Sequence, residues 1–143
     1  MDNTNTTPII SLGLRKKSFA IDGDENRVIY LDPSDMGIIN RIDVFGKQID
    51  TIIEKLKDVP ADQLGSRIVE VDVEMREAID KIFDYEVCAV CVPSGTMFDV
   101  VDGKFKFEIV VQGLSNVYTN TISTEMKKIN DRISSHTQKY IKK

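Results

Sequence analysis

The sequence predicts a mainly helical α+β domain, with an N-terminal β-hairpin followed by three or four helices. Three observations lead to this fold class. Two short β-prone runs flank a polar turn between residues 17 and 31. Apolar residues then recur at helical spacing over about 33–58, 62–85 and 105–140. The chain has 143 residues, of which 41% are apolar, so it can bury a core in one domain without disulfides or metals.

Residues 1–15 are expected to form a flexible leader, and residues 16–143 a single domain. The polar first eight residues include no basic region followed by an apolar run, so we expect no signal peptide. No stretch approaches the roughly 20 apolar residues that a membrane span needs. Together with only two cysteines, these features predict a soluble protein of a reducing cytoplasm.

The region 17–31 is typical of a β-hairpin, because residues 23–26 (Gly-Asp-Glu-Asn) form a turn between two β-prone runs. The acidic residues of this turn also match the opening spacing of a calcium loop. However, Arg27 and Pro33 stand where an EF-hand has its glycine and its bidentate glutamate. We therefore interpret the cluster as a turn.

The first helix is expected to begin at Asp32, which is suited to the N-cap, with Pro33 at the first helical position and Asp35 in the first turn. It should end near Asp58, before Pro60. Its apolar face comprises Ile38, Ile42, Phe45, Ile49, Ile52 and Leu56.

A second helix is expected from about Asp62 to about Tyr85. Its apolar face comprises Leu64, Ile68, Val71, Met75, Ala78 and Ile82. The apolar run 87–92 that follows fits either a buried helical extension or a short strand, and the pattern does not decide between them.

Residues 105–140 predict a long third helical region, which Gly113 is expected to bend or break. Its second half has a narrow apolar seam in a polar surround, formed by Ile122, Met126, Ile129 and Ile133. Such a seam packs on its own domain, on a partner or on another subunit, and the first is the simplest interpretation.

Catalytic and metal-binding motifs are weak in this sequence. Cys88 and Cys91 have CxxC spacing, but a zinc site needs four ligands, and the chain offers no third cysteine and one histidine, His136. The cysteines lie among small apolar residues, which favours a buried structural role. Asp99 and Asp102 flank a turn at Asp102-Gly103 and are interpreted as turn formers.

No glycine-rich phosphate loop or nucleophile elbow is present, so we expect no enzyme and no cofactor. The net charge of −4 argues against nucleic acid as a general partner. The lysines near the C-terminus are interpreted as a solvated helix end.

The order of these features resembles the small tail assembly chaperones of long-tailed phages and prophages of Gram-positive bacteria. The resemblance covers roughly residues 16–135 and is one of layout and soft motifs. These motifs are Leu31-Asp32-Pro33-Ser34-Asp35 before an amphipathic helix, Ile82-Phe83 before the Pro93 turn, and a C-terminal helix after Phe105-Lys106-Phe107-Glu108. The CxxC pair is not part of the family pattern.

The resemblance implies a chaperone that binds the tape measure protein in the host cytoplasm and helps recruit tail tube subunits. The candidate protein-binding residues are Met97 in the apolar segment 87–97, and Ile122, Met126, Ile129 and Ile133 in the helical seam. Self-association through the seam is left open. The alternatives are a structural tail or connector protein retained in the virion, and a small enzyme or redox protein using Cys88 and Cys91.

Overall fold

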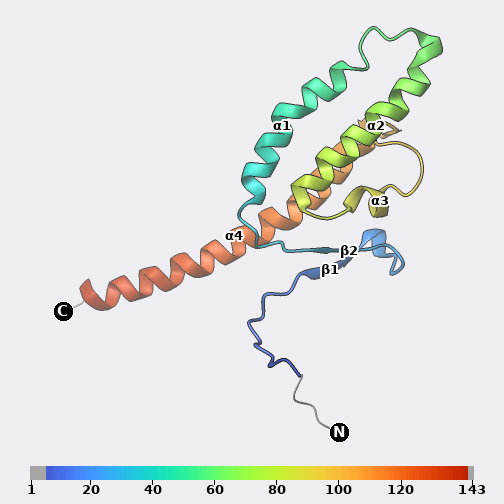
Figure 1. Cartoon of the computed structure of the whole chain (residues 1–143). Coiled ribbons are helices and arrows are strands. Elements are labelled where there is room, and N and C mark those ends of the chain that lie inside the picture. Colours follow the sequence, from blue (N-terminus) through green and yellow to red (C-terminus); the bar gives the residue numbers. More distant parts are fainter. Residues whose placement is uncertain (1–5, 142–143) are drawn as a thin grey trace.

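The computed structural model describes residues 6–141, and side chains as far as residue 135. Residues 6–16 have no regular secondary structure. The elements that follow are β1 Lys17–Ala20, η1 Ile21–Gly23, β2 Val28–Leu31, α1 Ile38–Glu54, α2 Ala61–Phe83, α3 Val87–Cys91, β3 Val100–Val101, β4 Lys104–Phe105 and α4 Lys106–Ile141 (Figure 1). The predicted mainly helical α+β class with an N-terminal hairpin is confirmed. The predictions for His136 and for the last lysines fall on side chains outside the described ones.

The hairpin pairs β1 with β2 in antiparallel register, from Lys17 opposite Leu31 to Ala20 opposite Val28. Its turn contains the acidic cluster. The carboxylate of Asp24 accepts a hydrogen bond from the Asn26 amide at 2.9 Å, as expected of a turn-forming side chain. Alternation along β2 directs Ile29 and Leu31 into the core, where they are 0% and 1% exposed.

Helices α1 and α2 run side by side as an antiparallel pair (Figure 1). The predicted faces meet between them, although Leu64 at the start of the α2 stripe is 37% exposed. The buried members are Ile38, Phe45 and Ile52 of the α1 stripe and Val71, Met75 and Ile82 of the α2 stripe. Ile79 of α2, which the predicted stripe does not include, is buried as well.

The predicted start of α1 at Asp32 is wrong, because the helix begins at Ile38. Asp32 instead closes a local turn, accepting hydrogen bonds from the Ser34 amide at 3.3 Å and the Ser34 hydroxyl at 2.8 Å. Asp35 closes the next turn by accepting from the Gly37 amide at 2.9 Å. Aspartate is as good a turn former as it is an N-cap, so the same residues serve an irregular connection here.

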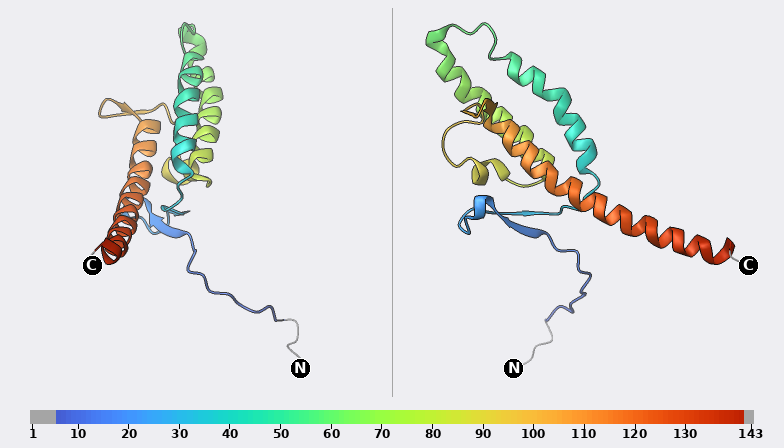
Figure 2. Two further views of the ribbon diagram at one scale, coloured as in Figure 1. Left: turned by 90° about the vertical axis from the view of Figure 1, so that its left-hand side faces the viewer. Right: turned by 180° about the vertical axis from the view of Figure 1, so that it is seen from behind.

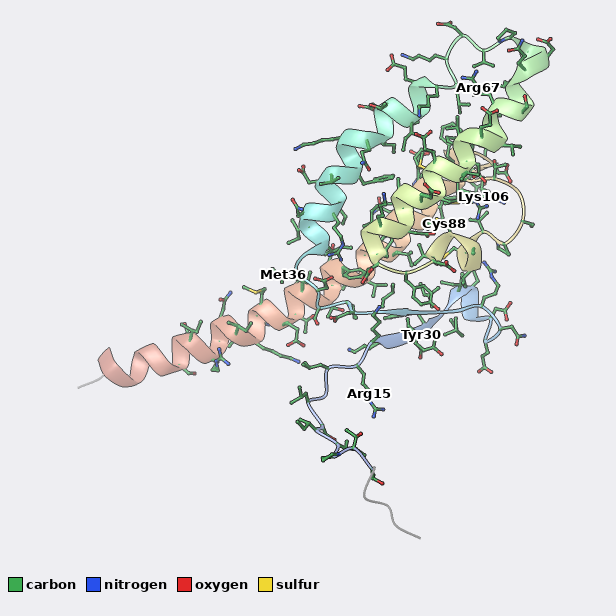
Figure 3. The ribbon with its side chains drawn as sticks, in the orientation of Figure 1. Arg15, Tyr30, Met36, Arg67, Cys88 and Lys106 are labelled. Carbon is green, nitrogen blue, oxygen red and sulfur yellow. The ribbon has the colours of Figure 1, made fainter. Side chains whose placement is uncertain are left out.

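Of the two structures that the sequence allows for residues 87–92, the chain forms a short helix, α3. Two arginines from other elements donate to carbonyl groups of α3, at its C-terminal end and at Cys88. Arg27 of the hairpin donates to the Val90 and Cys91 carbonyls at 3.1 and 2.7 Å. Arg76 of α2 donates to the Cys88 carbonyl at 3.3 Å, and Figure 3 shows Cys88 beside α2.

Helix α4 is continuous over 36 residues, so the expectation that Gly113 bends or breaks it is wrong. Its first half packs on the domain through Phe107, Leu114 and Tyr118, which are buried. Burial on one side holds the helix through the glycine. The second half runs on beyond the other elements (Figures 1 and 2).

Candidate protein-binding surface

The predicted seam lies where α4 leaves the domain. Ile122 is partly buried against the core. Further along, Met126, Ile129 and Ile133 are 40%, 37% and 52% exposed. The spacing of 4, 3 and 4 residues puts all of these side chains on one face of the helix. The structure thus brings the four α4 residues together and covers them only at the Ile122 end.

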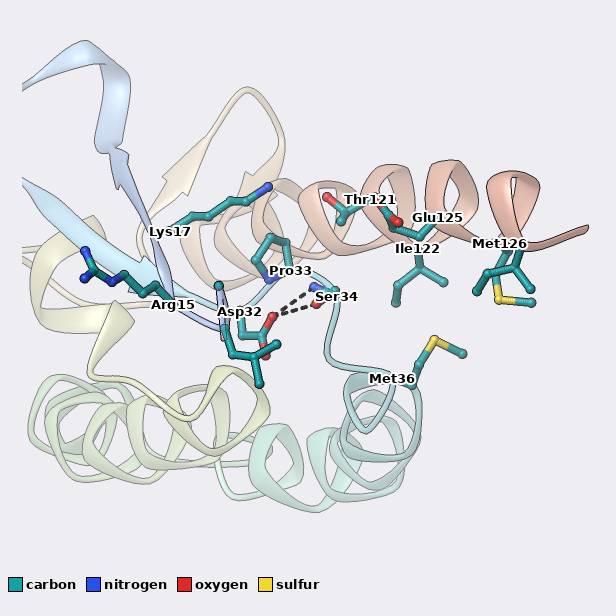
Figure 4. Close-up of a pocket in the computed structure, with 13 residues that line it drawn as sticks. Arg15, Lys17, Asp32, Pro33, Ser34, Met36, Thr121, Ile122, Glu125 and Met126 are labelled. Carbon is teal, nitrogen blue, oxygen red and sulfur yellow. Dashed lines mark hydrogen bonds between the residues drawn. The ribbon is translucent and has the colours of Figure 1, made fainter. Parts of the chain in front are cut away.

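A groove with a volume of about 420 Å³ opens beside this seam, between α4, the leader and the connection from β2 to α1. Figure 4 shows Met36, Ile122 and Met126 pointing into the space between the connection and the helix. The groove also has charged lining residues of both signs, namely Arg15, Lys17, Asp32 and Glu125. An apolar floor with a charged edge is the usual anatomy of a protein-binding site.

Local turns explain why Met36 faces this groove. The Asp32 and Asp35 turns extend the connection past α4 before α1 begins, and Met36 is left 53% exposed. Arg41 anchors the connection by donating to Asp35 at 2.7 Å and to the Ile82 carbonyl at 2.7 Å. The hydrogen bond from Arg41 also lowers the pKa of the Asp35 carboxyl.

The leader adds apolar side chains that the sequence interpretation missed. Ile9, Ile10, Leu12 and Leu14 are 70–88% exposed, and Leu14 lines the groove. The signal was present in the sequence as the alternation of Ile10, Leu12 and Leu14 with small residues. Leu14 therefore adds to the exposed apolar surface that Met36 and the seam form around the groove.

Met97 does not belong to this surface. Its side chain is 0% exposed, and its amide donates to the buried Asp72 carboxylate at 2.7 Å. The expectation that Met97 faces a partner is therefore wrong for this structure: the loop folds inward because a buried hydrogen bond holds it.

The two cysteines are free thiols, with Cys88 buried and Cys91 half-buried. Burial raises the pKa of both thiols, and that of Cys91 reaches about 11. A reactive cysteine needs the opposite shift, toward the thiolate. Within residues 6–135, no three His, Cys, Asp or Glu side chains gather as they would around a metal ion.

Asp99 and Asp102 occupy turns, as their positions predict. Hydrogen bonds from the Thr96 hydroxyl and amide lower the pKa of the Asp99 carboxyl, and Lys106 adds to the effect. Asp102 and Gly103, with φ of 51° and 78°, form the tight turn between β3 and β4.

Among the described residues, no helix is both long enough and apolar enough to cross a membrane. Comparison of the chain with protein-family models, with curated proteins and with solved structures found no match.

Proposed function

We propose that this chain is a binding protein without catalytic activity, and specifically a tail assembly chaperone. Its client is the helix-rich tape measure protein, which it keeps soluble in the host cytoplasm while tail tube subunits are recruited. The observation that carries this proposal is the exposed apolar seam of α4, where Met126 and Ile129 stand outside the core.

The chemistry of the surface suits a helical client. An amphipathic helix docks by placing side chains at i, i+3, i+4 and i+7 into an apolar groove. Met36 and Met126 are flexible side chains that adapt to more than one partner shape. The apolar contact is small, and the charged residues around it stay hydrated. We therefore expect a complex from which another protein can displace this chain.

The layout described above also supports the proposal, since a hairpin, an amphipathic helix pair and a C-terminal helix follow one another as in tail assembly chaperones. One of the soft motifs forms turns in the structure, whereas the sequence predicts that it starts the helix. The Leu31-Asp32-Pro33-Ser34-Asp35 segment leads to α1 through two turns, and its residues Asp32, Pro33 and Ser34 line the groove.

Co-expression with the tape measure protein tests the proposal. We expect the wild-type chain to keep the client soluble and to co-purify with it. Ile129→Glu should abolish the complex, because a carboxylate would have to be desolvated within the seam. Lys127→Glu is the control, since it lies outside the seam and places the same side chain on an exposed site.

An insoluble client in the presence of the wild-type chain would contradict the proposal. So would a complex that survives Ile129→Glu as well as it survives Lys127→Glu. The transient role has a separate test in mass spectrometry of purified particles: we expect the chain to be absent from mature tails, and a stoichiometric copy number would favour a structural subunit.

A further inference from the structure

The α4 seam is self-complementary when two copies of the helix meet in antiparallel orientation. Its four residues are spaced so that Ile122 of one copy lies opposite Ile133 of the other, and Met126 lies opposite Ile129. Two-fold symmetry repeats both contacts, so every seam residue meets an apolar residue of the second copy.

Charge fixes the orientation of this pairing. Glu125 and Arg132 each precede a seam residue directly, at Met126 and Ile133, so both lie along the same edge of the seam. In an antiparallel pair these edges meet, and Glu125 of each copy comes beside Arg132 of the other. In a parallel pair Glu125 would instead meet Asn130, and no ion pair would form between the described residues of the two copies, although Glu125 keeps its ion pair with Lys128 of its own chain at 3.4 Å.

The structure leaves three of the four seam residues accessible, while Ile122 is partly buried against the core of its own copy. Met126 and Ile129 are 40% and 37% exposed, and Glu125 and Arg132 are both exposed. In the antiparallel register, Ile133 of the second copy would lie over Ile122, at the groove lined by Leu14 and Met36. The second copy would thus cover the seam and the adjoining end of the groove.

We propose that two copies of this chain associate through an antiparallel pair of α4 helices, with reciprocal Glu125–Arg132 ion pairs beside an apolar seam. The paired region, residues 122–133, is about 18 Å long at 1.5 Å per residue. Four seam residues and two charged residues per copy are far fewer than the roughly 20–30 residues a side of stable complexes, so the dimer is weak and depends on concentration. The inference does not depend on the proposed client.

Sedimentation equilibrium of the purified chain without client tests the inference. We expect a monomer–dimer equilibrium in the wild type. Arg132→Glu places like charges across both symmetric contacts and should weaken the dimer about tenfold. Lys127→Glu changes the net charge equally but lies away from the seam, so it should leave the equilibrium within about twofold of the wild type.

The double variant Glu125→Arg/Arg132→Glu reverses both charges and should restore the dimer to near wild-type strength. Ile129→Glu should give only monomer, and circular dichroism should show unchanged helix content in each variant. A monomer at all concentrations would overturn the inference. A dimer of wild-type strength in Ile129→Glu would overturn it as well. So would a double variant whose dimer is no stronger than that of Arg132→Glu.

Discussion

The carboxylate of Asp72 joins α2 to the loop before β3. One oxygen accepts the Met97 amide at 2.7 Å, and the other accepts Arg76 at 2.9 Å. Arg76 in turn donates to the Val92 and Gly95 carbonyls, at 3.1 and 3.2 Å. Every member of the network therefore has a partner, as a buried polar group requires.

Replacing Asp72 with alanine should lower the free energy of unfolding by about 2–4 kcal/mol, because the Met97 amide and the Arg76 guanidinium lose their acceptor inside the protein. Urea denaturation followed by circular dichroism measures this. Asp43→Ala is the control, since Asp43 forms only an exposed ion pair with Lys47, and it should cost less than about 1 kcal/mol. If the two variants lose equal amounts of unfolding free energy, the buried network stabilises the protein no more than an exposed ion pair does.

The thiols give a second prediction at this scale. The native Cys91 should react slowly with a disulfide reagent at neutral pH, and its rate should keep rising toward pH 11, because burial raises its pKa from 9.0 to about 11. Unfolding in urea should make both thiols react at ordinary rates. A native rate that levels off near pH 9 would indicate an exposed thiol.

The same shift affects stability. A raised pKa in the folded state means that the folded chain holds its proton more tightly, so the unfolded chain ionises first as the pH rises. The stabilisation from the neutral Cys91 thiol is therefore complete below pH 9 and is lost as the pH rises toward about 11. Burial raises the pKa of Tyr118 to about 12, and this acts in the same direction.

At the scale of elements, two glycines with open space around them should respond oppositely to alanine. Gly113 lies inside α4 with nothing within 4 Å of an added Cβ, so Gly113→Ala should stabilise the protein by about 0.5–1 kcal/mol. Gly103 has φ of +78° in the β3–β4 turn, so Gly103→Ala should destabilise it by about 1 kcal/mol. Thermal unfolding compares the variants, and a loss of stability in Gly113→Ala would mean that α4 needs the glycine.

The periodicity of apolar residues predicts which segments are helices, but it does not predict where α1 begins. The stripes of α1 and α2 repeat over four or more turns, so long-range packing and local pattern agree there. Asp32 and Asp35 fit a helix start and a turn equally well. In the structure both form turns, and Asp35 is held by Arg41, which also donates to the Ile82 carbonyl of α2. No local pattern specifies such a contact.

The candidate site was only partly predictable for the same reason. The spacing of Ile122, Met126 and Ile129 identified a seam, and the structure leaves most of it uncovered. Met97 is expected at the surface because it belongs to the apolar segment 87–97. An apolar run has the same pattern whether it faces a core or a partner, and here the Asp72 hydrogen bond holds the loop inward. The contribution of Met36 depends on a connection between elements, which periodicity does not describe.

At the scale of the whole molecule, the domain has a packed body and a protruding helix. The hairpin, α1, α2, α3 and the first half of α4 share one core, and the second half of α4 extends from it (Figure 2). An isolated helical extension is marginally stable in water, so its apolar face gains most from a second helix. This arrangement separates the stability of the body from binding at the extension, and seam variants should therefore bind poorly while unfolding normally.

Hydrogen–deuterium exchange of the chain, alone at monomer concentration and in the complex with the tape measure protein, tests this separation most directly. We predict slower exchange over residues 122–133 and in the leader around Leu14 in the complex, with α2 unchanged. Unchanged exchange over residues 122–133, with protection on another face, would contradict a binding role for the seam.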